Sequence, residues 1–210
     1  MDRSCQEGPV SHVESGPGRS AVVPGSTRLT LLVHGSTRAT AEAAFPADDA
    51  LEDRARTLAS AVLLPRADHL VRGPERACGE TCDATGAADV VVDDDLRGWD
   101  AGRWSGRTLD ELAAEDPSGL QAWLTDPAAA PHGGESLTAL LERVERWLAD
   151  RPAGHTLAVC GPAVPRAAVV VAMGAPATAF WRVDAAPLTV TDLRGGPSRW
   201  TVRATGRAPA

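Results

Sequence analysis

The stretch Leu29–Thr37, LTLLVHGST, constrains the fold of this chain most. Its residues from Leu29 to Val33 are apolar or β-branched, the composition of a strand buried on both faces of a sheet. The run stops at His34, which Gly35 follows. Ligands of open α/β sheets bind at the strand ends, because the loops leaving the strands form a crevice there. The sequence therefore predicts a histidine at a ligand-binding edge, although a structural histidine that caps a loop fits the same pattern.

Composition excludes several classes of function. All 21 basic residues are Arg, so the chain has no lysine for a Schiff base or a phosphate cradle. It also has no tyrosine that could serve as a phenolic acid or base. The formal net charge of −7 argues against nucleic acid or an anionic membrane as the main partner, because both attract basic surfaces.

The length of 210 residues favours one domain with a full core. Residues 1–26 are polar and rich in Gly, Pro and Ser, so we expect a disordered leader there and a single domain over 27–206. The sequence shows neither a signal peptide nor an apolar run of membrane-spanning length. We therefore expect a cytoplasmic protein.

The cysteines and clustered carboxylates do not form a metal-binding pattern. Cys5, Cys78, Cys82 and Cys160 lack the spacing of a disulfide framework or a zinc site. The consecutive carboxylates at 93–95 end an expected strand, where neighbouring side chains point in different directions. We expect neither a metal ion nor another cofactor.

Expected strands alternate with expected helices along the chain. Apolar runs predict strands over 29–33, 68–71, 88–92, 155–160, 188–193 and 200–204. Periodicity and capping residues predict a loop over 35–47 and helices over 48–63, 74–86, 136–149 and 163–173. In the helix after Ser136, the residues expected to face water are Glu142, Arg143, Glu145 and Arg146. The alternation predicts an α/β fold, a three-layer α/β/α sandwich whose mostly parallel sheet has an antiparallel edge.

Five segments carry motifs whose order and spacing belong together. Residues 31–37, LLVHGST, correspond to Leu-x-Arg-His-Gly-x-Thr, and 73–81, GPERACGET, look like Ser-Pro-Leu-x-Arg-Ala-x-x-Thr, with differences at several positions. Residues 96–106, LRGWDAGRWSG, correspond to Leu-x-Glu followed by Gly-x-Trp-x-Gly. The motif GGES is intact at 133–136, and 159–167, VCGPAVPRA, match a strand–turn–helix that carries a second histidine. From about residue 28 to 205 the chain resembles the histidine phosphatase superfamily, the phosphoglycerate mutase-like proteins, which implies that fold.

The resemblance implies phosphoryl transfer by a histidine nucleophile, with arginines and a second histidine on the phosphate oxygens and a carboxylic acid that protonates the leaving oxygen. His34 matches the nucleophile. The arginine before it is Val33 here, and the arginine of the second motif falls on Ala77. The acid and the second histidine fall on Gly98 and Gly161. These replacements predict a wider and less polar pocket.

The candidate catalytic residues are His34, Asp100 and Glu135. Asp100 lies two positions beyond the missing acid, and Glu135 belongs to the intact GGES motif. The candidate substrate-binding residues are Val33, Ser36, Arg76, Arg97, Trp99, Trp104, His132, Cys160 and Gly161. Each also has an ordinary structural interpretation, such as a surface ion pair for Arg76 and Arg97.

Our first functional hypothesis is an enzyme that uses His34 as general acid or base on a small, rather apolar biosynthetic intermediate, in an isomerisation, cyclisation or elimination. One alternative is a phosphomonoesterase with His34 as phosphohistidine nucleophile, in which Arg76 and Arg97 replace the lost arginines. Another is a pseudophosphatase that binds a ligand without turnover. The expected partner is a small molecule, and the chain is a candidate homodimer.

Overall fold

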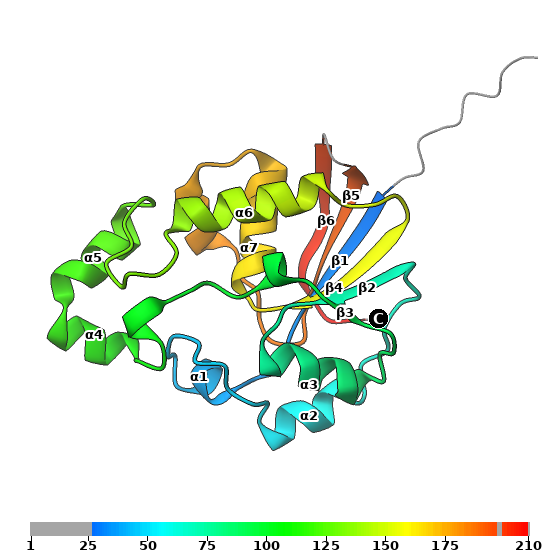
Figure 1. The fold of residues 1–210 in the computed structure, drawn as a ribbon, viewed down its shortest axis with the longest axis horizontal. Helices are drawn as coiled ribbons and strands as arrows, with labels where there is room; N and C mark the ends of the chain where they lie inside the picture. The colour runs from blue at the N-terminus through cyan, green and yellow to red at the C-terminus, as the bar shows by residue number, and fades with distance from the viewer. Residues whose placement is uncertain (1–26, 197–198, 210) are drawn as a thin grey trace, which may run out of the picture.

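The strands of the computed structural model form one mixed sheet with helices packed against it (Figure 1). The structure describes residues 27–196 and 199–209, and the predicted leader, 1–26, lies outside the described residues. The strands are β1 (Thr27–Val33), β2 (His69–Arg72), β3 (Val91–Val92), β4 (His155–Cys160), β5 (Val190–Gly196) and β6 (Arg199–Arg207). Their order across the sheet is β3-β2-β4-β1-β5-β6.

Strand β1 lies inside this sheet. It pairs parallel with β4 and antiparallel with β5, and every residue from Leu29 to Val33 is buried. Strand β2 pairs parallel with both β4 and β3, whereas β5 and β6 pair antiparallel. The parallel part and the antiparallel edge confirm the fold class that the sequence predicts.

The helices are α1 (Arg38–Ala41), α2 (Asp53–Ala59), α3 (Arg76–Thr85), α4 (Leu109–Glu115), α5 (Pro117–Thr125), α6 (Leu137–Ala149) and α7 (Ala163–Met173). Short 3-10 helices are η1 (Asp94–Leu96), η2 (Gly102–Trp104) and η3 (Ala177–Arg182). Helices α3 and α7 end at Gly86 and Gly174 in the left-handed conformation, as their sequences predict. Within the described ranges, none of the helices has the length and apolar character needed to cross a membrane.

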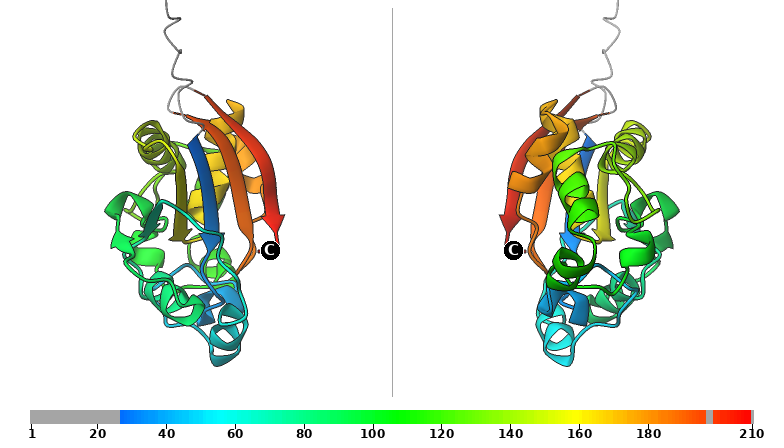
Figure 2. Two further views of the ribbon diagram at one scale, coloured as in Figure 1. Left: turned by 90° about the vertical axis from the view of Figure 1, so that its right-hand side faces the viewer. Right: turned by 90° about the vertical axis from the view of Figure 1, so that its left-hand side faces the viewer.

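Successive side chains of β1 contribute to two cores. Leu29 and Leu31 pack with α6 and α7 on one face, and Leu32 packs with Cys78 and Cys82 of α3 on the other. Both views in Figure 2 show the twisted sheet with these helices against it. Helices on both faces confirm the predicted three-layer arrangement.

Some element boundaries differ from the sequence-based prediction. Residues 38–41 form α1 within the predicted loop, because Thr37 begins the helix with a capping box. The helix predicted over 48–63 is shorter, and Asp48 has a φ of 56°, which a right-handed helix does not allow. Asp89 has the same φ of 56°, so the strand predicted over 88–92 begins only at Val91.

Candidate active site

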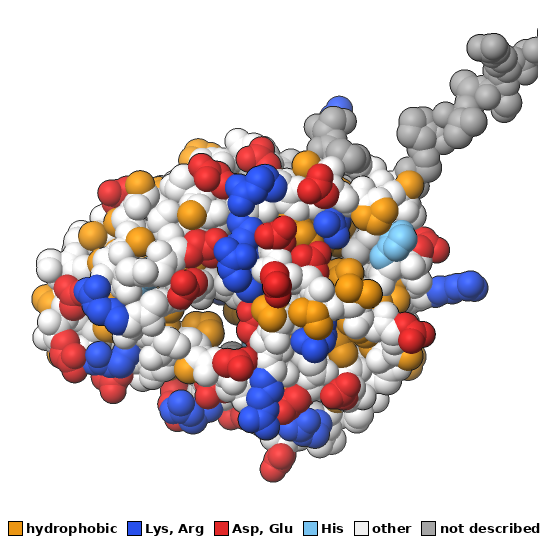
Figure 3. Space-filling view, in the orientation of Figure 1, with side chains coloured by type: hydrophobic (Ala, Val, Ile, Leu, Met, Phe, Trp, Pro, Cys, Tyr) orange, Lys and Arg blue, Asp and Glu red, His pale blue; other side chains and the backbone are white. Residues whose placement is uncertain are grey.

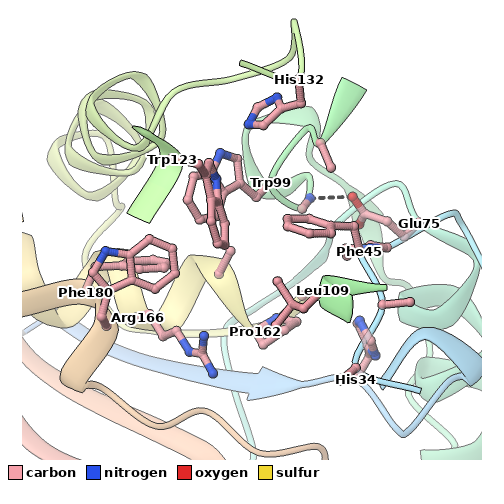
Figure 4. Close-up of a pocket in the computed structure, with 18 residues that line it drawn as sticks. His34, Phe45, Glu75, Trp99, Leu109, Trp123, His132, Pro162, Arg166 and Phe180 are labelled. Atoms are coloured by element: carbon pink, nitrogen blue, oxygen red, sulfur yellow. Dashed lines mark hydrogen bonds between the residues drawn. The ribbon is translucent and has the colours of Figure 1, made fainter. Parts of the chain in front are cut away.

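Four loops that leave the parallel strands meet at one edge of the sheet. His34 follows β1, Glu75 follows β2, Gly98 follows β3 and η1, and Gly161 follows β4. All four line a pocket with a volume of about 220 Å³, shown in Figure 4. In Figure 3 the surface is hollowed between the α4–α5 side and the α3 side, with hydrophobic side chains inside. This is the edge at which ligands bind in open α/β sheets.

His34 presents a free ring nitrogen to this pocket. Its Nδ1 lies 2.8 Å from the carbonyl oxygen of Gly35. A carbonyl can only accept a hydrogen bond, so Nδ1 carries the proton and Nε2 keeps its lone pair. Burial lowers the pKa of His34 below its usual 6.5, although the Gly35 carbonyl and the charge of Glu75 raise it. The imidazole is therefore neutral at pH 7, the form that acts as nucleophile or base.

Two glycines leave space beside this nitrogen. A Cβ added to Gly161 would lie 3.9 Å from Nε2 of His34 and 3.7 Å from Cα of Gly98. In the motif comparison, these glycines stand where a second histidine and a carboxylic acid are expected. The space next to Nε2 is consequently open to a ligand.

Glu75, which the motif comparison does not assign, lies beside these glycines. It lines the pocket, and its Oε1 accepts a hydrogen bond from the backbone N–H of Gly98 (Figure 4). A Cβ added to Gly98 would lie 3.4 Å from that oxygen. Sequence reasoning missed Glu75 because the motif has a leucine at its position. The signal that could have found it is a charged residue in the loop directly after a strand.

Aromatic side chains form another wall of the pocket. The residues are Phe45, Trp99, Trp123, Phe180 and Trp181. The ring centroids of Trp123 and Trp181 lie 4.6 Å apart, and those of Trp99 and Trp123 lie 5.2 Å apart. Such a wall suits flat apolar groups of a ligand.

The pocket lining also contains buried donors without a partner among the described residues, namely Nε of Arg166 and Nε2 of His132. Nδ1 of His132 accepts a hydrogen bond of 3.0 Å from the N–H of Gly134, so its Nε2 carries the proton. Arg166 belongs to the first turns of α7 and is the one arginine in the lining within the described ranges. Each of these donors is available to an acceptor atom of a ligand in the pocket.

The sequence was also compared with models of known protein families. The sequence model of the histidine phosphatase superfamily (branch 1) matches residues 29–207. The chain belongs to the histidine phosphatase superfamily. The fold predicted from the five motifs is thereby confirmed.

Several similar proteins are known. A bifunctional protein of Mycobacterium tuberculosis is 50% identical over 60 residues, which cover 29% of this chain and 16% of that protein. A glucosyl-3-phosphoglycerate phosphatase of Mycolicibacterium vanbaalenii is 34% identical over 125 residues, which cover 55% of this chain and 56% of that protein. The structure of the alpha-ribazole phosphatase of Shigella flexneri has a TM-score of 0.73 at 22% identity, covering 87% of this chain and 98% of that one. The chain thus spans 16% of the length of the first of these relatives and 56% of the length of the second.

These findings correct the first functional hypothesis. Two of these three proteins are named as phosphatases, and none is named as an isomerase or a cyclase. The interpretation as an isomerisation, cyclisation or elimination of an apolar intermediate is therefore wrong. The alternative of a phosphomonoesterase with a histidine nucleophile agrees better with the relatives.

Among the predicted catalytic residues, His34 lines the pocket, whereas Asp100 and Glu135 lie outside its lining. Asp100 is exposed, and its Oδ1 accepts a hydrogen bond of 2.9 Å from the N–H of Gly102. Glu135 forms two hydrogen bonds with Arg143, of 2.8 and 2.7 Å. The prediction that Arg143 faces water is wrong: its side chain is 2% exposed, because the chain around Gly98 covers it.

The arginines proposed to replace the lost phosphate ligands lie outside the pocket lining. Arg76 is exposed, and its Nε lies 2.8 Å from Oε1 of Glu80. Arg97 is exposed as well, with Nη2 at 3.7 Å from Oε1 of Glu135. A role for either in binding stays a prediction.

The predicted substrate-binding residues that line the pocket are Trp99, His132 and Gly161. Trp104 is buried behind this wall, with its ring centroid 5.2 Å from that of His132. Val33 and Cys160 are buried strand ends, and Ser36 lies in the loop after β1 outside the lining. Burial raises the pKa of the Cys160 thiol well above its usual range, so Cys160 stays protonated.

Proposed function

We propose that this protein is a phosphomonoester hydrolase that uses Nε2 of His34 as its nucleophile and forms a transient phosphohistidine. The observation that carries the proposal is the orientation of a neutral imidazole, whose Nδ1 donates to Gly35 while Nε2 faces the open pocket. The names of related phosphatases support the same type of reaction.

The proposed phosphate position lies between His34 and the start of α7. Gly161 and Pro162 precede that helix, Ala163 begins it, and all three line the pocket. The N-terminus of a helix attracts anions. Arg166, about one turn into α7, adds a positive side chain whose Nε has no hydrogen-bond partner among the described residues. Together these groups supply donors for the equatorial oxygens, on which negative charge resides during transfer.

We further propose that this phosphate site is degenerate and that turnover is slow. Val33 and Ala77 replace the two arginines of the family motifs, and Gly161 replaces the second histidine. Loss of one such donor typically costs on the order of 3 kcal/mol of transition-state stabilisation. Such losses are not additive, yet together they favour a weakly active enzyme.

The aromatic wall suggests the class of substrate. Trp99, Trp123 and Phe45 surround the part of the pocket that the alcohol group of an ester would occupy. The volume of about 220 Å³ admits a compact group. We therefore propose phosphomonoesters of compact aromatic or otherwise apolar alcohols as substrates, with Nε2–H of His132 available to an acceptor atom.

The proposed activity is tested by phosphate release from a panel of aryl and alkyl phosphomonoesters. We expect slow hydrolysis with aryl esters preferred, and an alkaline quench should trap a phosphoprotein that is stable in base and lost in acid, as a phosphohistidine is. If neither phosphate nor phosphoprotein forms across the panel, the proposed function is wrong.

Replacing Gly161 with histidine should raise phosphatase activity. A Cβ at this position meets only ordinary contacts, and its 3.9 Å separation from Nε2 of His34 places a second imidazole beside the transferred group. We expect kcat/KM for an aryl phosphate to rise about 10- to 100-fold, the effect of one added donor. Gly161→Ala is the control, since it adds the Cβ without a donor. Equal activity of the two variants would contradict a phosphate site beside Gly161.

A further inference from the structure

We propose that Glu75 is the general acid of this site and replaces, from a different loop, the carboxylic acid that the family motif places at position 98. The inference rests on the proposed phosphomonoesterase activity. It assigns a catalytic role to a residue at which the family motif has a leucine.

The geometry of neighbouring loops supports this assignment. Strands β2 and β3 are parallel neighbours, so the loops that carry Glu75 and Gly98 leave the sheet side by side. Oε1 of Glu75 is held by the N–H of Gly98, at the place where a side chain on residue 98 would begin. Gly98 in turn lies next to Gly161, which faces Nε2 of His34. The carboxylate therefore reaches the region beside the nucleophile that an acid at 98 would occupy.

Two glycines make room for this carboxylate. A Cβ added to Gly73 would lie 2.5 Å from Oε2 of Glu75, and it would also lie 2.8 Å from the backbone oxygen of Leu96. A Cβ added to Gly98 would touch Oε1 at 3.4 Å. The family motifs have serine at 73, leucine at 75 and an acid at 98, whereas this chain has glycine, glutamate and glycine. The three differences are mutually consistent, because the carboxylate of Glu75 lies where side chains at 73 and 98 would begin, and both positions are glycine.

The reaction balances with Glu75 in this role. The first step starts with Glu75 in its protonated form. Nε2 of His34 forms a bond to phosphorus, the ester O–P bond breaks, and the leaving oxygen keeps the bonding pair and takes the proton of Glu75, which becomes a carboxylate. In the second step water attacks phosphorus, the N–P bond breaks, and the Glu75 carboxylate accepts the proton of that water. Inorganic phosphate leaves, and both side chains return to their starting states.

Glu75 also has a structural role that the experiment must separate from catalysis. Its carboxylate fixes the backbone of Gly98, and Oε2 lies 3.6 Å from Sγ of Cys78. Glu75→Gln keeps an oxygen that can accept from Gly98 and removes the transferable proton, although its NH2 group replaces the oxygen beside Cys78. Comparing leaving groups then distinguishes the two roles, because a general acid matters only when the leaving oxygen is basic.

We expect Glu75→Gln to lower kcat/KM for phenyl phosphate by about 100-fold, with a much smaller loss for 4-nitrophenyl phosphate, whose alcohol leaves without a proton. Glu145→Gln is the matched control, since Glu145 is an exposed carboxylate on α6 outside the pocket lining, and it should affect both esters equally little. If Glu75→Gln lowers kcat/KM equally for both esters, or for neither, Glu75 is not the general acid. Hydrolysis by the wild type would still support the proposed function in that case. Lack of hydrolysis by the wild type would overturn both.

A transfer of the acid provides a second test. Glu75→Ala frees the space at Gly98, which has no left-handed backbone conformation and so accepts a side chain. We expect the double variant Glu75→Ala, Gly98→Glu to hydrolyse phenyl phosphate faster than Glu75→Ala alone, and to restore the lower sensitivity to the leaving group. If the double variant is folded by circular dichroism and no faster than the single variant, the proposed equivalence of the two positions is wrong.

Discussion

Replacing His34 with asparagine is expected to lower the rate of phosphate release from aryl phosphates by at least about 1,000-fold, because loss of a catalytic nucleophile typically has an effect of this size. Asparagine keeps a polar group near the Gly35 carbonyl but has no nitrogen that can form a phosphohistidine. The trapped phosphoprotein should therefore disappear as well. Both readouts follow from the neutral imidazole and its free Nε2.

A second histidine serves as the control for this experiment. His69 is exposed at the start of β2, whereas the pocket lies at the ends of the parallel strands. His69→Asn should retain the activity of the wild type. If His34→Asn and His69→Asn release phosphate at the same rate, His34 is not the nucleophile.

Much of the fold follows from local patterns in the sequence. Strand β4, residues 155–160, and helix α7, residues 163–173, have the predicted bounds. The apolar run of β4 ends at Gly161-Pro162, and this turn separates the strand from the helix. The predicted element boundaries are wrong where the backbone conformation of a single residue sets them. Asp48 and Asp89 adopt positive φ values, which aspartate tolerates but does not require, so the sequence alone does not reveal them.

The candidate site is less predictable than the fold. His34, Trp99 and Gly161 line the pocket because they stand at motif positions next to strand ends. The relation between Glu75 and Gly98 cannot be obtained from either motif, since 23 residues separate them and only the pairing of β2 with β3 joins their loops. Arg166 reaches the pocket through the placement of α7, which is likewise a property of the assembled sheet.

Replacing Arg143 with methionine is expected to lower the free energy of unfolding by about 3–5 kcal/mol, because it leaves the buried Glu135 carboxylate with only the exposed Arg97, at 3.7 Å, as a charged neighbour among the described residues. Glu135 is 8% exposed and Arg143 is 2% exposed, and Nη2 of Arg143 lies 2.7 Å from Oε2 of Glu135. Urea denaturation followed by tryptophan fluorescence measures the change. Arg146→Met on the exposed side of α6 is the control and should change stability by less than about 0.5 kcal/mol. Equal effects of the two substitutions would contradict the buried ion pair.

The other hydrogen bonds of Arg143 connect this stability to the pocket. Its guanidinium donates to the carbonyl oxygens of Asp95, Arg97 and Gly98, and so holds the loop that carries Gly98 against α6. Adding Glu135→Leu to Arg143→Met removes the unpaired charge but leaves these carbonyls without a donor. The double variant should therefore regain only part of the lost stability. Because the loop also presents its N–H to Glu75, the double variant should stay less active than the wild type at a temperature where both are folded.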